Sequence, residues 1–236
     1  MPSPTSQRVV LVTGAGHGIG LGVARRFRDE GWRVVGADRA PMQEPGLRAV
    51  RTDVAEEDAV AALLASVATE EGRLDALVSN AGFMVRTPLA TLSLADWSRV
   101  IGTNLTATFL LARAAEPLLR ASRGSIVTIA STRARMSEPD TESYAASKGG
   151  LVSLTHALAI SLGPDVRANC ISPGWIDVRG DTLTDADHAQ HPAGRVGRVE
   201  DVASLAVWLA GPESGFVTGA EFVVDGGMTR KMIYAE

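Results

Sequence analysis

Features typical of secreted, membrane-spanning and nucleic-acid-binding proteins are scarce in this sequence. Cys170 is the one cysteine among 236 residues, so no disulfide can form within the chain, and a reducing compartment is the simplest expectation. No apolar run reaches the roughly 18 residues that a membrane-spanning helix needs. The formal net charge of −4 argues against a surface for nucleic acid or for an anionic membrane. We therefore expect a soluble, cytoplasmic protein.

Internal repeats, low-complexity linkers and blocks of like charge are also missing, which favours a single domain. A hydrophobic content of 45% is enough for a sizeable core. Residues 1–7 are polar and proline-bearing, without an apolar signal segment, and are expected to be a disordered lead. Residues 8–236 are expected to form the one domain.

Short apolar runs alternate along the chain with longer amphipathic stretches, which is the pattern of stacked βαβ units. The short runs are apolar almost throughout, as in parallel strands covered on both faces. The sequence thus predicts an α/β fold, with a doubly wound parallel seven-stranded sheet and helices on both faces. The predicted strands are Arg8–Thr13, Arg33–Asp38, Leu47–Thr52, Ala76–Ser79, Ser125–Ala130, Arg167–Ile171 and Glu221–Val224, and the predicted helices are Gly18–Glu30, Glu56–Glu71, Ser93–Leu119, Ser143–Leu162 and Val199–Ala210.

One connection is too short for a crossover helix. Eight residues separate Asp38 from Leu47, and they include Pro41, Pro45 and Gly46. We expect a loop, or one helical turn at most.

A glycine-rich segment, Thr13 to Gly20, follows the first predicted strand and opens the first predicted helix. Its four glycines let the backbone turn sharply and approach a ligand closely. The helix N-terminus then offers free N–H groups and a positive dipole end to a pyrophosphate. A glycine-rich loop alone is often an ordinary turn, so the strand–loop–helix context carries the prediction of a dinucleotide site.

Asp38 ends the second predicted strand, where an acidic residue accepts hydrogen bonds from the adenosine ribose. The 2′-phosphate of NADP would place a second anion against this carboxylate, so NAD is the expected cofactor and NADP is less favoured. Arg39 is the complication, because arginine suits phosphate well. We still favour NAD, because Arg39 begins the loop, the glycine-rich segment has no Lys or Arg, and no further cation follows before Arg48.

Seven motifs in order over about 220 residues make the chain resemble the short-chain dehydrogenase/reductase family. They are Thr13 to Gly20, Asp53-Val54, Ser79-Asn80-Ala81-Gly82, Asn104, the set Ser131, Tyr144 and Lys148, Pro173-Gly174, and Val224-Asp225-Gly226-Gly227. Ser79 stands where the family has a first asparagine. Val178 stands where a threonine often reaches the nicotinamide carboxamide, and Thr182 is a candidate replacement.

The resemblance implies a Rossmann-type fold and a role for each motif. Asn104, Ser131, Tyr144 and Lys148 would be catalytic, with Asn104 holding a water that links Lys148 to solvent. Residues 177–197, approximately, would be the substrate loop, which is short here. The cofactor would be bound by Gly14, His17, Gly18, Ile19, Gly20, Asp38, Arg39, Asp53, Val54, Asn80, Ala81, Gly82, Tyr144, Lys148, Pro173, Gly174 and Ile176.

Hydride transfer from an alcohol needs a base for the hydroxyl proton. Tyrosine is a poor base at neutral pH, because its unperturbed pKa is near 10, but a nearby cation lowers that pKa. Tyr144 and Lys148 are four apart on a predicted helix and share one face, so Lys148 is expected to lower the pKa of Tyr144. The family implies that Lys148 also bonds the nicotinamide ribose. Ser131 directly follows a predicted strand and can donate to the substrate oxygen.

The leading hypothesis is an NAD-linked enzyme that interconverts a secondary alcohol and a ketone. A 3-oxoacyl-thioester reductase shares every motif, and Arg133 and Arg135 are thin support for an acyl-carrier surface. A catalytically silent NAD-sensing protein is disfavoured because Tyr144 and Lys148 are both present. An enoyl reductase is disfavoured because that relative spaces its tyrosine and lysine more widely.

The expected partner is a small-molecule alcohol or ketone, with no nucleic acid and no membrane. No metal is expected, since Asp185, Asp187, His188 and His191 fit a solvated loop better than a metal site. Trp175 is a candidate for the substrate pocket. A homotetramer is predicted, because relatives pair through the two long helices, and Leu105, Phe109 and Ala112 on one and Leu151, Leu154 and Leu158 on the other form apolar stripes.

Overall fold

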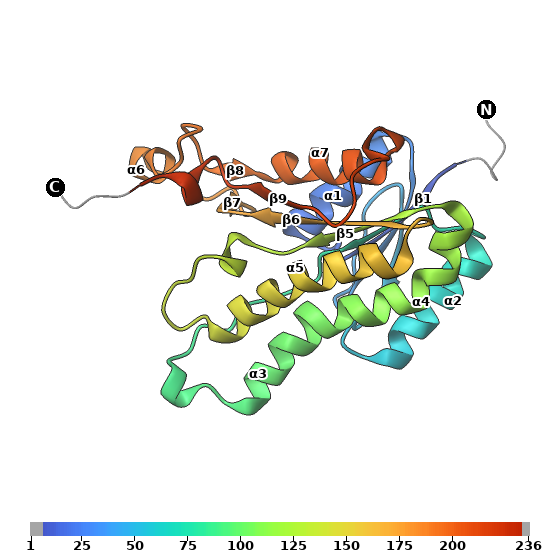
Figure 1. The fold of residues 1–236 in the computed structure, drawn as a ribbon, viewed down its shortest axis with the longest axis horizontal. Helices are drawn as coiled ribbons and strands as arrows, with labels where there is room; N and C mark the ends of the chain where they lie inside the picture. The colour runs from blue at the N-terminus through green and yellow to red at the C-terminus, as the bar shows by residue number, and fades with distance from the viewer. Residues whose placement is uncertain (1–6, 233–236) are drawn as a thin grey trace.

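A computed structural model describes residues 7–232 of the chain (Figure 1). Seven strands form one sheet in the order β3-β2-β1-β4-β5-β6-β9, and every neighbouring pair is parallel. The predicted doubly wound sheet is therefore confirmed. The strands are β1 Val9–Thr13, β2 Arg33–Asp38, β3 Leu47–Arg51, β4 Ala76–Ser79, β5 Ser125–Ile129, β6 Arg167–Pro173 and β9 Glu221–Val224. Apart from Gln7, the predicted disordered lead lies outside the described residues.

Helices cover both faces of the sheet, as predicted (Figure 1). Alternate residues of each strand point to opposite faces, so Val9 and Leu11 join one core cluster while Val10 and Val12 join the other. The first cluster is covered by α2 Glu57–Glu70, α4 Ala107–Ser122 and α5 Glu142–Leu162. The second is covered by α1 Gly18–Asp29 and α7 Val199–Ala210. Cys170 is buried within the domain.

The prediction of one continuous α-helix over Ser93–Leu119 was wrong, because the α-helical hydrogen-bond pattern is interrupted within this range. The helical run consists of α3 Leu94–Ile101, a π-helical turn η3 Gly102–Thr106, and α4. Ser93 caps the start of α3, since its hydroxyl accepts from the Asp96 backbone N–H at 3.0 Å. The π turn adds a residue to the helix at Asn104, and such turns often lie at functional sites.

The connection from Asp38 to Leu47 contains no helix, as predicted. The segment predicted as a substrate loop has more structure than expected, namely β7 Ile176–Asp177, α6 Asp185–Ala189 and β8 Gly197–Arg198. The description of its histidines as solvated was wrong for His191, which is 2% exposed with its ring beside Trp175. Short 3-10 turns complete the fold at η2 Leu89–Thr91, η4 Thr132–Ala134, η5 Pro212–Ser214 and η6 Met228–Arg230.

The two apolar stripes are divided between the core and the surface. Ala112 and Leu151 are buried inside the domain, whereas Phe109 is 45% exposed. The homotetramer therefore stays a prediction. Within residues 7–232 no helix is both long and apolar enough to cross a membrane.

Close packing of α1 against α7 depends on a glycine. A Cβ on Gly22 would overlap Cγ1 of Val199, whose β-branched side chain has little freedom to move away. We expect Gly22→Ala to lower the free energy of unfolding by about 1–3 kcal/mol through overpacking. Urea unfolding at one protein concentration measures this.

Gly149→Ala is the matched control, because Gly149 lies within α5 and a Cβ there would come no closer than 3.9 Å to the Ala134 carbonyl oxygen. The control should gain about 0.5–1 kcal/mol from improved helix propensity. An equal effect of the two substitutions would contradict the packing argument.

Candidate active site

A cavity of about 760 Å³ opens at the carboxyl ends of β1, β4 and β5. The sheet order changes direction between β1 and β4, and such a switch point is where open parallel sheets bind ligands. Of the predicted site residues, those that line the cavity are Gly14, His17, Gly18, Ile19, Asn80, Ala81, Gly82, Ser131, Tyr144, Lys148 and Gly174.

Eight other predicted site residues do not line this cavity: Gly20, Asp38, Arg39, Asp53, Val54, Asn104, Pro173 and Ile176. Gly20 lies in the first turn of α1, where a Cβ would overlap the Gly14 carbonyl oxygen. Pro173 ends β6, and Ile176 packs against the core from β7. Asp38, Arg39, Asp53 and Val54 all lie near the ends of β2 and β3.

The glycine-rich loop leads into a helix whose first N–H groups have no side-chain cap. The N-cap residue of α1 is His17, whose side chain makes no capping bond, and no acidic residue lies in the first turn. Gly14 and Gly18 have φ values of 65° and 55°, a conformation that favours glycine. N–H groups without a side-chain cap and the positive end of the helix dipole are suited to bind an anion.

The end of β4 holds the glycine-rich loop in place. The Asn80 side-chain amide donates to the carbonyl oxygens of Thr13 at 2.9 Å and Gly14 at 3.3 Å. In return, the Thr13 hydroxyl accepts from the backbone N–H groups of Asn80 at 3.1 Å and Ala81 at 3.2 Å. Ser79, which departs from the family motif, shares a 2.8 Å hydrogen bond with the Thr108 hydroxyl.

The Asp38 carboxylate lies over the same loop. One oxygen accepts from the Gly16 backbone N–H and the other from that of Ala40, both at 2.9 Å. Arg39 is exposed, and its carbonyl oxygen accepts from Nε of Arg51 at 3.2 Å. Arg51 stands opposite Asp38 in the β2–β3 register, so the structure adds a cation near Asp38 that the order of residues along the chain does not indicate.

Asp53 and Val54 follow β3. Val54 is buried in the core, and one Asp53 oxygen accepts from the backbone N–H of Ala55 at 3.1 Å. This bond closes the turn that leads into α2.

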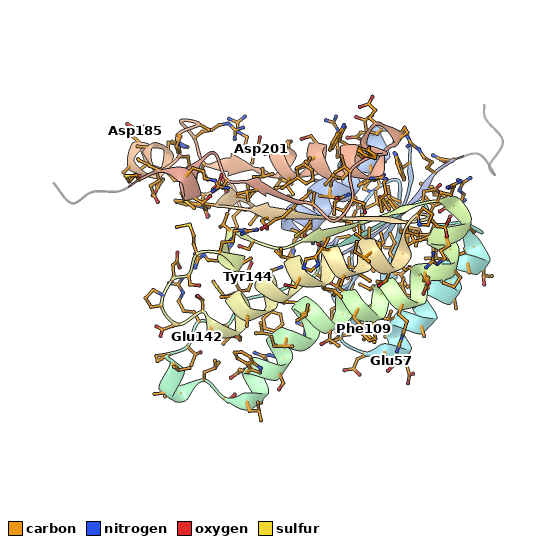
Figure 2. All side chains as sticks on the ribbon, viewed as in Figure 1. Glu57, Phe109, Glu142, Tyr144, Asp185 and Asp201 are labelled. Atoms are coloured by element: carbon orange, nitrogen blue, oxygen red, sulfur yellow. The ribbon has the colours of Figure 1, made fainter. Side chains whose placement is uncertain are left out.

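Tyr144 and Lys148 lie one turn apart near the start of α5, where Figure 2 labels Tyr144. Nζ of Lys148 is 5.5 Å from the centre of the Tyr144 ring and donates to the Ile129 carbonyl oxygen at 2.8 Å. Burial lowers the pKa of Lys148 from 10.5 to about 8. The lysine thus shares a buried face with the tyrosine, as predicted.

The direction of the Tyr144 shift differs from the expectation. Burial raises the pKa of the phenol, while a hydrogen bond with Ser131 and the positive charge of Arg133 oppose that effect. The sequence argument considered the charge of Lys148 and omitted the cost of placing a phenolate in a desolvated site.

Asn104 is fully buried in the π turn and holds other parts of the site. Its side-chain oxygen accepts from the Phe83 backbone N–H at 3.0 Å, and its amide donates to the Phe83 carbonyl oxygen at 2.9 Å and the Ser147 hydroxyl at 3.0 Å. The side chain is thereby committed to positioning the segment after β4 against α5. The water that Asn104 was expected to hold stays a prediction.

The Pro-Gly turn packs against the end of β9. A Cβ on Gly174 would lie 2.7 Å from that of Asp225, so only glycine fits there without movement. Val178 and Trp175 line the cavity, the latter as expected, whereas Thr182 does not.

Arg179 and Gln190 line the cavity from the predicted substrate loop, but sequence reasoning missed several other cavity residues: Phe83, Met84, Arg86, Thr132, Arg133, Glu138 and Met228. Phe83, Thr132 and Arg133 directly follow motif residues at strand ends, which was an available signal. Met228, at the start of η6, also directly follows a motif residue, whereas Met84, Arg86 and Glu138 lie in loops whose paths the sequence does not specify. Among the described residues, no group of three or more His, Cys, Asp and Glu could hold a metal ion.

A family model described as enoyl-(acyl carrier protein) reductase matches residues 14–229. An uncharacterized oxidoreductase of Thermotoga maritima is 45% identical, over 97% of this chain and 98% of its own. The chain belongs to the short-chain dehydrogenase/reductase family. It is therefore an oxidoreductase of this type, as predicted from its motifs.

Three further similar proteins agree with this assignment. The cis-4-hydroxycyclohexanecarboxylate dehydrogenase of Sinomonas cyclohexanicum is 38% identical, over 95% of this chain and 97% of its own. The ligand-free aldohexose dehydrogenase of Thermoplasma acidophilum superimposes with a TM-score of 0.93 at 30% identity, over 99% of this chain and 98% of that one. A 3-ketoacyl-(acyl-carrier-protein) reductase of Brucella melitensis, complexed with NADH, gives a TM-score of 0.87 at 30% identity, over 95% of this chain and 99% of that one.

Short-chain dehydrogenases use nicotinamide cofactors, and the residues of this chain fit one. The uncapped start of α1 suits a pyrophosphate, and the cavity continues from Gly14 and Gly18 to Tyr144 and Lys148. The end of the cavity at Tyr144 and Lys148 is therefore continuous with the end at the start of α1 that suits the pyrophosphate.

Lys148 is expected to lower the stability of the ligand-free protein. Its folded pKa of about 8 lies below 10.5, so between these values the unfolded chain binds more protons and stability rises with pH. Below pH 8 the full penalty applies, about 3 kcal/mol from a shift of this size. Lys148→Met removes the penalty and also one hydrogen bond, so we expect a gain of about 1–3 kcal/mol in the free energy of unfolding at pH 7.

The gain in the free energy of unfolding of Lys148→Met should be smaller at pH 9.5 than at pH 7. Urea unfolding at pH 7 and pH 9.5 measures this difference. Lys231→Met, at an exposed position, is the control and should stay within about 0.5 kcal/mol of the parent at both. A loss of stability in Lys148→Met at pH 7 would refute the assigned penalty.

Proposed function

We propose that the protein is an NAD-dependent enzyme that interconverts a secondary alcohol and a ketone, with Tyr144 as its acid/base. The observation that carries the proposal is the placement of Tyr144, Ser131 and Lys148 on one wall of the cavity that the glycine-rich loop enters. The dehydrogenase names of the Sinomonas relative and of glucose 1-dehydrogenase 2 from Bacillus subtilis, which is 35% identical, support it.

Ser131 is suited to orient the substrate oxygen. Its hydroxyl oxygen accepts from the Arg133 backbone N–H at 3.2 Å. That bond uses the acceptor side, and in the ligand-free protein the hydroxyl also hydrogen-bonds Tyr144, so a substrate oxygen beside the phenol would share the hydroxyl hydrogen. In the reducing direction this hydrogen bond stabilises the negative charge that builds on the carbonyl oxygen.

Tyr144 is suited to move the proton. A bound nicotinamide supplies or accepts the hydride at the reacting carbon, and Tyr144 gives or takes the proton at the reacting oxygen. In the oxidising direction the phenolate is needed, and both the Ser131 hydrogen bond and the Arg133 charge favour it against burial. Lys148, with a pKa of about 8, is mainly cationic at neutral pH and adds a second positive charge one helical turn away.

Two alternatives are less well supported. For a 3-oxoacyl-thioester reductase, Arg133 and Arg135 would need to share an acyl-carrier surface, but Arg133 pairs with Glu138 and Arg135 with Glu221. A silent NAD-sensing protein has no need of an assembled Tyr144 and Lys148 pair.

Cytoplasmic location stays a prediction.

Tyr144→Phe tests the proposed mechanism. Deleting the phenolic oxygen removes proton transfer while leaving the ring, so turnover should fall by about a hundredfold to ten-thousandfold with NAD binding nearly unchanged. The assay follows NADH absorbance over a panel of secondary alcohols and ketones, and calorimetry measures NAD affinity. Activity within threefold of the parent on a substrate the parent uses would exclude Tyr144 as the acid/base.

NAD preference rests on the Asp38 carboxylate. It is fixed over the glycine-rich loop by two backbone N–H groups, so a 2′-phosphate would meet an anion that cannot turn away freely. We expect kcat/KM to favour NAD by about tenfold to a thousandfold, and Asp38→Ser to shift the ratio toward NADP.

Arg51→Met is the companion variant for this measurement. Arg51 is the cation opposite Asp38, so its removal should widen the preference for NAD if it attracts the phosphate. A parent enzyme that prefers NADP, or an unchanged ratio in Asp38→Ser, would show that Asp38 does not select the cofactor.

A further inference from the structure

Arg133 has an unused hydrogen-bond donor beside the proposed acid/base. The turn η4 that follows Ser131 directs it to the cavity, whose lining it shares with Tyr144. Its positive charge lies near enough to favour the Tyr144 phenolate. One terminal nitrogen pairs with Glu138, but the other, Nη1, is buried with no hydrogen-bond partner. A buried guanidinium N–H without a partner is costly, and in a functional cavity it points to a ligand that supplies the acceptor.

A second arginine is held beside the first by the same carboxylate. One oxygen of Glu138 pairs with Arg133 and the other with Arg86, which also lines the cavity. The two arginines raise each other's energy by repulsion, and one carboxylate compensates only one of the two charges. The Glu138 bridge therefore brings together two guanidinium groups with a net positive charge, of which Arg133 is the more buried.

The whole cavity shares this imbalance. Among the described residues that line it, Arg86, Arg133, Arg179 and Lys148 are cationic, and Glu138 is the one carboxylate. Such an excess attracts an anionic ligand and disfavours a cationic one. The guanidinium fork matches a carboxylate in particular, because two parallel N–H donors meet its two oxygens.

We infer that Arg133, supported by Arg86, binds a carboxylate on the substrate, so the substrate is a secondary alcohol or ketone that is also a carboxylic acid. The inference rests on the proposed function, because it places the reacting carbon at Tyr144. A neutral sugar or an acyl thioester has no charge to offer Arg133 at this depth. Simple alcohols would leave the Nη1 donor unpaired.

Arg135 provides a matched control two residues along the chain. It is more exposed than Arg133, lies outside the cavity, and pairs with Glu221. Replacing it removes the same charge from the same segment without changing the cavity.

The experiment compares oxo acids with their methyl esters, which differ in charge and little in shape. The probes are 3-oxobutanoate, 4-oxopentanoate and 5-oxohexanoate, each against its ester, with NADH oxidation as the readout for the parent enzyme, Arg133→Met, Arg133→Lys and Arg135→Met. We expect kcat/KM to favour the acid by about tenfold to a hundredfold at one chain length or more. Arg133→Met should abolish that ratio, Arg133→Lys should retain part of it, and Arg135→Met should preserve it.

Binding gives a readout that does not depend on turnover. Calorimetry on the Tyr144→Phe protein loaded with NADH, with and without Arg133→Met, measures the affinity for the same six probes. Tighter binding of an acid than of its ester, lost with Arg133→Met, supports the inference even if hydride transfer to these probes fails.

Two outcomes would overturn the carboxylate site while leaving the proposed function intact. One is equal kcat/KM for acid and ester at every chain length in a parent enzyme that reduces them. The other is an equal loss for acid and ester in Arg133→Met, which would mean that Arg133 acts only on the Tyr144 phenol. If no probe is reduced, an absence of any acid-over-ester difference in binding also overturns it.

Discussion

The hydrogen bonds between the ends of β1 and β4 connect the glycine-rich loop to the rest of the cavity. The Asn80 side chain donates to the carbonyl oxygens of Thr13 and Gly14. The Thr13 hydroxyl accepts from the backbone N–H groups of Asn80 and Ala81, which follow β4. Parallel strands leave β1 and β4 ending at the same edge, so these bonds join the glycine-rich loop to the segment that Asn104 ties to α5. The anion-binding start of α1 and the tyrosine wall are thereby kept at the two ends of one cavity.

Burial shifts the pKa values of the two groups that the proposed chemistry uses, and the shift of Lys148 also costs stability in the folded protein. Desolvation lowers the pKa of Lys148 to about 8 and raises that of Tyr144, so at neutral pH the lysine is still mainly cationic and the phenol is neutral in the ligand-free protein. Groups that oppose this effect, the Ser131 hydroxyl and the Arg133 charge, lie on the same cavity wall. The phenolate that the oxidising direction needs therefore depends on these neighbouring groups, which offset part of the cost of burial.

Most of the fold was predictable because the strands and helices differ in their apolar patterns. The fully buried β1 reads as a continuous apolar run, and the prolines after Asp38 exclude a crossover helix. The π turn at Asn104 was not predictable, since it changes the hydrogen-bond pattern without changing the helical period on either side. Nor was the burial of His191, which depends on Trp175 and on the close approach of Gly226 after β9.

The sequence by itself determined the family, the sheet, the glycine-rich loop and the pairing of Tyr144 with Lys148, because these depend on local pattern and on spacing within one helix. Only the tertiary structure decided the direction of the Tyr144 pKa shift, the position of Arg51 opposite Asp38, and the division of labour between Arg133 and Arg135. Each of these depends on which groups from distant segments meet and how much water they exclude. Those quantities are properties of packing, which neither the identity nor the spacing of the residues contains.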